Sequence, residues 1–90
     1  DYQAKIIKRL EARGAYVIKV VAASKKGVPD LVACFRGRFL AIEVKTPVTR
    51  SNTSKLQMYN LDKIKDADGY ALVAVQAEEL DWVLDEIEQQ

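Results

Sequence analysis

Apolar residues recur along this chain with two different periods, and the changes between them mark the expected elements. Ile6, Ile7 and Leu10 repeat at helical spacing, which predicts a helix over residues 2–13 that ends at Gly14. The last segment shows the same period and predicts a helix over 78–88, with one apolar face made by Leu80, Val83, Leu84 and Ile87.

Four β-rich runs lie between these helices and predict strands. They span residues 16–21, 30–35, 39–45 and 70–75. Residues 22–28 read as a loop, and Pro47 closes the third strand because it cannot donate to a ladder. A helix capped by Ser51, Thr53 or Ser54 is expected to run to about Ala67, with Gly69 just past its end.

The resulting order is α-β-β-β-α-β-α, which indicates an α/β fold. A hairpin and a strand-helix-strand crossover combine into a mixed four-stranded sheet flanked by helices. Ninety residues make one domain, over residues 1–90. No apolar run reaches the roughly 20 residues of a membrane span, so no membrane partner is expected. With a single cysteine, Cys34, and no histidine, the composition favours a reducing cytoplasm.

Charge is distributed unevenly. All 14 Lys and Arg lie between Lys5 and Lys65, while the segment after residue 77 holds only acidic charges. A basic body is typical of proteins that bind polyanions. An ordinary solvated surface with an acidic terminal helix explains the same numbers, and charge alone favours that interpretation.

The candidate chemistry lies at Pro29-Asp30 and Glu43-Val44-Lys45. If the turn is Arg36-Gly37, Asp30 lies opposite Glu43; if it is Gly37-Arg38, Asp30 lies opposite Lys45, with Glu43 one diagonal step away. Both registers put the three side chains on one face, since side-chain direction alternates along a strand. A three-residue turn would send the two carboxylates to opposite faces.

Two neighbouring carboxylates repel each other unless a cation lies between them. A divalent metal would supply that cation, and Lys45 would then stand beside a phosphate. A partly buried Asp-Glu-Lys ion cluster without chemistry is the simpler alternative. The Pro-Asp turn, the spacing and the shared face together favour the functional interpretation.

Two further polar residues sit beside apolar stripes. Glu11 lies four residues after Ile7, at the edge of the first helix's stripe, and points over the sheet or pairs on the surface with Lys8. Gln57 precedes Leu61 by four residues, so it lies on an inward face where a buried amide needs partners. A backbone carbonyl would serve Gln57 as well as a water or phosphate would.

Several basic and polar residues are candidates for contact with phosphates. A flexible loop carries Ser24, Lys25 and Lys26 just before the Pro-Asp turn, Arg36 and Arg38 flank the hairpin tip, and Arg50 and Lys55 flank the start of the middle helix. Each alone is as well explained as a solvated side chain. Trp82 lies off the apolar stripe of the last helix, so it covers a core edge or marks a partner surface.

Taken in order, Glu11, Gly27-Val28-Pro29-Asp30, Ala41-Ile42-Glu43-Val44-Lys45 and Lys55-Leu56-Gln57 resemble the VRR-NUC family, the virus-type replication-repair branch of the PD-(D/E)xK nucleases. The resemblance covers nearly the whole chain, and with it we expect the cytoplasm of a bacterial or phage-infected host cell. It implies the restriction-endonuclease-like core and a Mg²⁺- or Mn²⁺-dependent DNA phosphodiesterase that leaves 5′-phosphate and 3′-hydroxyl ends.

Residue by residue, the resemblance makes Asp30, Glu43 and the Val44 carbonyl metal ligands, assisted by Glu11. It makes Lys45 the group that orients the attacking water, supported by Gln57. Family members of this size resemble homodimers that cut four-way (Holliday) DNA junctions, whereas larger proteins use the domain on flaps and branched ends. A non-catalytic nucleic-acid-binding module and a protein-interaction domain remain alternatives; the intact acid-acid-lysine set speaks against the first.

Overall fold

The computed structural model describes all 90 residues and shows seven main elements with one short 3₁₀ turn. In order, they are α1 (Tyr2–Ala12), β1 (Tyr16–Lys19), β2 (Leu31–Phe35), β3 (Arg38–Val44), α2 (Lys55–Asp66), β4 (Tyr70–Ala74), η1 (Ala77–Leu80) and α3 (Asp81–Glu88). The predicted α-β-β-β-α-β-α order is confirmed. No helix is both long enough and apolar enough to cross a bilayer.

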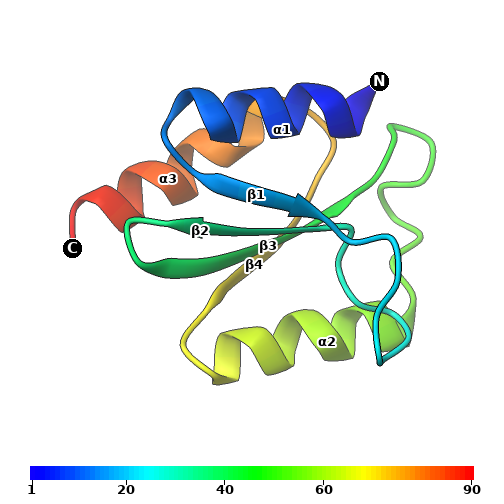
Figure 1. The fold of residues 1–90 in the computed structure, drawn as a ribbon. Helices are drawn as coiled ribbons and strands as arrows, with labels where there is room; N and C mark the ends of the chain where they lie inside the picture. The colour runs from blue at the N-terminus through cyan, green and yellow to red at the C-terminus, as the bar shows by residue number, and fades with distance from the viewer.

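The four strands form one mixed sheet in the order β1-β2-β3-β4. β1, β2 and β3 pair antiparallel, and β4 joins β3 in parallel after the α2 crossover. Helices α1 and α3 lie on one side of the sheet and α2 lies on the other (Figure 1). The expected mixed four-stranded sheet flanked by helices is therefore confirmed.

Two boundaries differ from the sequence-based prediction by more than one residue, each for a local reason. β1 ends at Lys19 rather than at residue 21, because the Val20 N–H bonds to the Asp30 carbonyl and the chain then leaves the sheet. The last helix opens with the η1 turn, where Glu79 Oε1 accepts hydrogen bonds from the backbone N–H groups of Val75 and Gln76. The predicted helix over 78–88 is thus η1 followed by α3.

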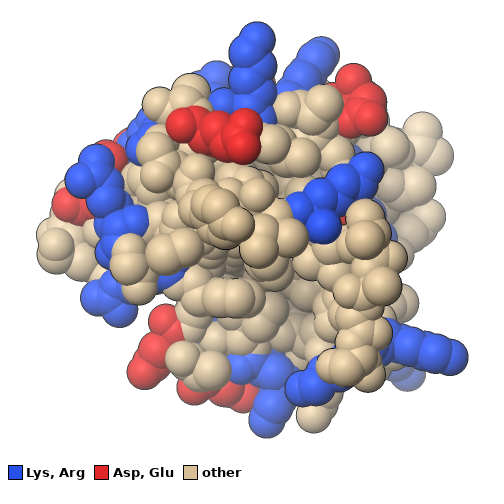
Figure 2. Space-filling model, viewed as in Figure 1, with Lys and Arg blue, Asp and Glu red and all other residues tan.

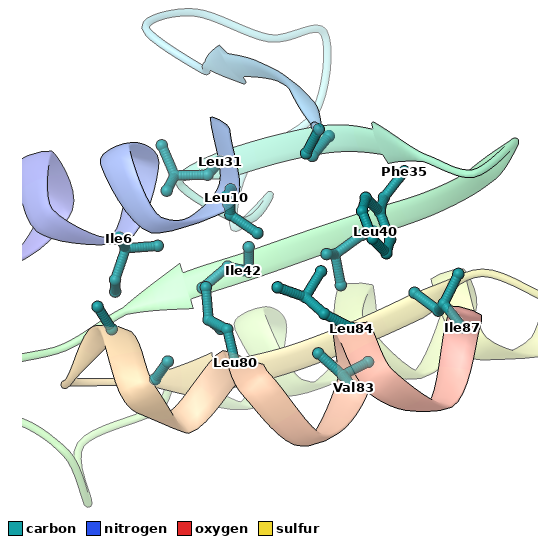
Figure 3. Packing of buried hydrophobic residues seen from close by; sticks show 14 residues of the cluster. Ile6, Leu10, Leu31, Phe35, Leu40, Ile42, Leu80, Val83, Leu84 and Ile87 are labelled. Atoms are coloured by element: carbon teal, nitrogen blue, oxygen red, sulfur yellow. The ribbon is translucent and has the colours of Figure 1, made fainter. Parts of the chain in front are cut away.

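Most of the core lies between the sheet and the α1/α3 layer (Figure 3). The inward-facing strand residues of this layer meet apolar side chains from three helical segments. Its fully buried members include Ile6, Leu10, Leu31, Leu40, Ile42, Leu80 and Leu84. On the other side only Ala41, Leu61 and Ala71 are buried together beneath α2. The α2 side therefore has room for polar groups.

Candidate active site

The β2–β3 turn decides which side chains meet. Arg36-Gly37 forms a two-residue turn in which both φ angles are positive, 52° and 77°, as a type I′ turn requires. Leu31 pairs with Ile42 in the resulting register. The next position outward therefore sets Asp30 opposite Glu43, on the α2 side of the sheet. This is the first of the two registers that the sequence allowed.

Asp30 is anchored to the end of β3 by its own carboxylate. Its Oδ2 accepts a hydrogen bond of 2.8 Å from the Val44 N–H. The N–H and C=O groups of one strand residue point toward the same neighbouring strand. The Val44 carbonyl consequently points to the side on which Asp30 stands, where β2 has already ended. The Asp30 carboxylate and the Val44 carbonyl, two of the metal ligands that the family resemblance implies, are therefore neighbours.

Glu43, Lys45 and Gln57 form a closed polar triangle. Gln57 Nε2 donates to Glu43 Oε2 at 3.0 Å, and Lys45 Nζ donates to Gln57 Oε1 at 3.1 Å. Lys45 Nζ also lies 3.4 Å from Glu43 Oε2. Glu43 is 4% exposed and is the only buried charged residue of the chain. The inward-facing amide predicted at Gln57 is confirmed in position, and its partners are the two charged groups of the site.

The start of α2 fixes the orientation of that amide. Ser54 caps the helix by accepting from the Gln57 N–H at 3.1 Å, and Gln57 Oε1 accepts from the Ser54 N–H at 3.0 Å. This reciprocal pair is a capping box. Because Oε1 is committed to two donors, Ser54 N–H and Lys45, the Nε2 end must face Glu43. The helix cap and the polar triangle are therefore one structure.

Burial raises the pKa of Glu43 above the ordinary value of a glutamate, and the neighbouring Asp30 carboxylate raises it further. The Lys45 ammonium acts in the opposite direction without cancelling the shift. A carboxylate held in this way is unfavourable as an anion unless more positive charge arrives. A cation placed beside Glu43 and Asp30 would relieve this repulsion.

The donor set fits a hard divalent metal ion that keeps several waters. Nowhere does the chain gather three or more His, Cys, Asp or Glu side chains as a protein-only metal cage. Mg²⁺ is commonly held by one or two carboxylates, with water and substrate oxygens filling the other positions. Asp30, Glu43 and the Val44 carbonyl supply such a partial shell.

Comparisons with known proteins agree with this geometry. The family model of the archaeal Holliday junction resolvases (Hjc) matches residues 1–90, the whole chain. The chain belongs to the archaeal Holliday junction resolvase family. A solved structure described as a VRR_NUC domain is 24% identical and superposes with a TM-score of 0.72, covering 93% of this chain and 90% of that one. No curated protein matches the chain.

Membership in the resolvase family makes the chain a nuclease of the PD-(D/E)xK superfamily and confirms the resemblance seen in the sequence. The VRR_NUC likeness supports the same fold. Neither comparison assigns roles to individual residues. Their placement in the structure is the basis for the proposals below.

Glu11 is not brought to the cluster. It lies one residue before the end of α1 and is exposed. The opposite end of α1 is the one near the site, because Tyr2 and Gln3 line a pocket of about 360 Å³ together with Val44 and Lys45. Eight residues of helix separate Gln3 from Glu11, about 12 Å along the axis. The helical spacing correctly placed Glu11 beside the apolar stripe of α1. It could not show which end of α1 lies near Val44 and Lys45.

Gln3 is the residue that sequence reasoning missed. Its Oε1 is the single buried side-chain oxygen or nitrogen without a hydrogen-bond partner. Buried polar atoms are nearly always paired, so an unpaired one calls for a water, an ion or a ligand. The signal was present in the sequence: Gln3 precedes Ile7 by four residues and Leu10 by seven, so it is a polar residue on the apolar stripe, as Gln57 is.

The loop with Ser24, Lys25 and Lys26 lies against α2. Asn60 Nδ2 donates to the Lys26 carbonyl at 3.0 Å, which ties the loop to the helix. Gly27 allows the contact, because it has a φ of 75° and a Cβ there would approach Leu56 Cγ to 2.7 Å. The side chains of all three candidate residues are exposed, and Lys55 is exposed in the first turn of α2. These groups remain available to a phosphate backbone.

The three arginine candidates, unlike the loop lysines, lie beside acidic side chains or at the hairpin tip. Arg50 pairs with Glu79 at 2.6 Å, and Arg36 pairs with Glu88 at 3.2 Å. Arg38 borders a pocket beside Arg36 and Glu88 at the hairpin tip. The tip lies at the far end of β3 from Glu43, roughly 17 Å away at about 3.4 Å per residue. The structure therefore does not bring Arg36 and Arg38 to the candidate site.

Proposed function

We propose that this chain is a metal-dependent endodeoxyribonuclease that cleaves four-way DNA junctions as a homodimer. The observation that carries the proposal is the cluster at the end of β3. Two opposed carboxylates there stand beside a lysine that α2 holds in place through Gln57. The family's name supplies the substrate class.

Asp30, Glu43 and the Val44 carbonyl would hold Mg²⁺ or Mn²⁺. Such an ion, when bound, acidifies a water and neutralises charge that develops on a phosphate. The raised pKa of Glu43 supports this role, because part of the shift comes from repulsion by Asp30, and a bound cation would relieve that repulsion. Without a cation, only Lys45 offsets the two acids.

Lys45 would act by position and charge. Its side chain is 12% exposed, and hydrogen bonding to Gln57 holds its ammonium group beside Glu43. A fixed ammonium in a largely dry site can stabilise negative charge on a phosphate and orient an attacking water. Gln57 would be the positioning residue that prevents Lys45 from swinging into solvent.

Gln3 would complete the site from α1. Gln3 lines the pocket that Val44 and Lys45 also line, and its buried Oε1 has no hydrogen-bond partner. An amide oxygen can accept a hydrogen bond from a water in that pocket. Gln3 would then take, at the opposite end of the same helix, the role that the family resemblance assigns to Glu11.

The test is a panel of labelled substrates: a four-way junction, a flap, a nicked duplex and a single strand, each with Mg²⁺, Mn²⁺ or EDTA. We expect cleavage only with a metal, and fastest on the four-way junction. Preference for the flap would replace the proposed substrate with another branched DNA. Binding of every branched substrate without any cleavage would instead identify a non-catalytic module.

A further inference from the structure

The loop between β3 and α2 joins two elements that carry the candidate site. It begins after Lys45 and ends at Ser54, the residue that caps α2 and bonds to Gln57. In Figure 1 this loop projects at the right of the molecule, beyond the body of the sheet. Because both of its ends belong to the site, a DNA strand bound there must pass close to the loop.

The first part of the loop is a turn held by its own hydrogen bonds. The Thr46 N–H donates to Thr49 Oγ1 at 2.9 Å, and the Thr49 N–H donates to the Thr46 carbonyl at 3.1 Å. Pro47 lies inside the turn and has a fixed φ. Just after the turn, Arg50 pairs with Glu79 of η1 at 2.6 Å, which ties the loop to the body of the protein. The turn is therefore held in one shape and fixed at its base.

Val48 is the apolar residue that this turn displays. It is 85% exposed and belongs to neither hydrophobic cluster. A single exposed valine is ordinary on a protein surface. Val48 differs from that ordinary case because the residues on either side of it are fixed, and because it lies three positions after Lys45. The loop thus holds an apolar side chain outward in water, beside the candidate site.

The charges around Val48 suit a polyanion. No acidic residue lies between Glu43 and Asp62, whereas Lys45, Arg50 and Lys55 all fall in this span. Figure 2, viewed as in Figure 1, shows the projection at the right with few charged side chains of its own. An apolar tip between basic residues can approach a DNA backbone without repulsion from carboxylates.

We propose that Val48 is a wedge that enters between the bases at the branch point of the DNA substrate. This inference rests on the proposed function. Proteins that open or bend DNA insert apolar side chains between base steps, at the cost of unstacking them. That cost is smallest where pairing is already disturbed. A branch point is such a place, so Val48 favours branched DNA over a continuous duplex without reading any base.

A protein partner is the weaker candidate for this tip. A standard protein interface buries about 800 Å² on each side, far more than one valine offers. A wedge needs a single apolar side chain on a fixed support, which the Thr46–Thr49 turn provides. The position of the tip directly after Lys45 would also set the distance between the branch point and the phosphate that is cut.

The wedge is tested by binding in EDTA, where the proposed metal-dependent cleavage does not occur. The probe is 2-aminopurine, a base analogue that fluoresces more strongly when unstacked, placed at the branch of a four-way junction or in a continuous duplex. V48S removes the apolar surface and V48I keeps it. V21S makes the same change at a valine that is 87% exposed on the β1–β2 loop.

We expect the wild type, V48I and V21S to raise the fluorescence at the branch and not in the duplex. V48S should leave it near the value of the free junction. V48S should also bind the junction about 10-fold more weakly, with unchanged affinity for the duplex. Because Val48 is exposed, its melting temperature should not change.

Equal fluorescence with V48S and the wild type, or an equal loss in V48S and V21S, would overturn the wedge. Altered sedimentation of V48S with unchanged junction binding would overturn it too, and would identify a protein contact. Cleavage of junctions without any unstacking would refute the wedge and leave the proposed nuclease standing. Unstacking that depends on Val48, with no cleavage when Mg²⁺ is added, would refute the nuclease and leave the wedge.

Discussion

The two faces of the central sheet differ in almost every physical respect. The face under α1 and α3 is dry and apolar, with fourteen buried residues in one cluster. The face under α2 buries three apolar residues together and also holds Glu43, the one buried charge. Most of the core lies on the first face, and the candidate active site lies on the second. Substitutions on the two faces should therefore have separable effects.

The acidic last segment belongs to the stable face. Arg9 pairs with Asp81 at 2.6 Å, and Arg13 pairs with both Asp85 and Glu88, at 2.8 and 2.9 Å. The arginines of α1 thus neutralise the acids of α3, and both lie away from the candidate site. The acids of the last segment are thus partly balanced within this layer. The exposed Lys25, Lys26 and Lys55 beside α2 form no ion pair and are among the basic groups that remain available.

We expect K45M to separate the effect on cleavage from the effect on stability most clearly. Loss of the ammonium group should slow single-turnover cleavage of a four-way junction by about 10³-fold, or roughly 4 kcal/mol of barrier. The fold should persist, because the main core lies on the other face. K65M, which changes an exposed lysine of α2, is the matched control and should cleave normally. Equal rates for the two variants would remove Lys45 from the site.

L84A tests the other face. Leu84 is fully buried in the large cluster, so its truncation should cost about 3 kcal/mol of unfolding free energy in urea denaturation. I64A truncates a partly buried side chain of α2 and should cost less, about 1 kcal/mol. At urea concentrations below its unfolding midpoint, where the protein is still folded, L84A should cleave near the wild-type rate. A larger loss in I64A than in L84A would contradict the assignment of the main core to the α1/α3 face.

E43Q should raise the melting temperature at neutral pH while abolishing cleavage. Because the folded-state pKa of Glu43 is raised, the folded protein holds this proton more tightly than the unfolded chain does. Ionisation of Glu43 therefore destabilises the fold as pH rises through that raised pKa. The advantage of E43Q should grow with pH across this window and vanish below the ordinary glutamate pKa. Melting curves at several pH values measure it.

Mg²⁺ offers the converse measurement on the same pair of proteins. A ligand that binds only the folded state raises stability. Added Mg²⁺ should therefore raise the melting temperature of the wild type and leave that of E43Q nearly unchanged. An equal rise in both proteins would mean that the ion binds elsewhere.

The smallest effect is expected from R13A. Its ion pairs with α3 lie on the surface, where such pairs contribute little and are screened by salt. We expect a slight fall in melting temperature that shrinks in high salt, with cleavage unchanged. A loss of activity in R13A would show that the two faces are coupled.

Much of this arrangement follows from short-range patterns. Strand periodicity placed Asp30, Glu43 and Lys45 on one face, and helical periodicity turned Gln57 inward. The sequence could not show the direction in which α1 crosses the sheet. That direction brings Gln3, and not Glu11, to the pocket beside Val44 and Lys45. Nor could it show the ion pairs between α1 and α3, because the partners lie more than seventy residues apart. Local periods fix faces, whereas tertiary packing fixes which ends meet.

The most direct test of the central claim compares D30N with D62N on a four-way junction in Mg²⁺. Asp30 lies in the candidate site and Asp62 is an exposed aspartate of α2. The expected result is metal-dependent cleavage by the wild type and D62N, and none by D30N, with junction binding retained in all three. Cleavage by D30N at the wild-type rate would contradict the account.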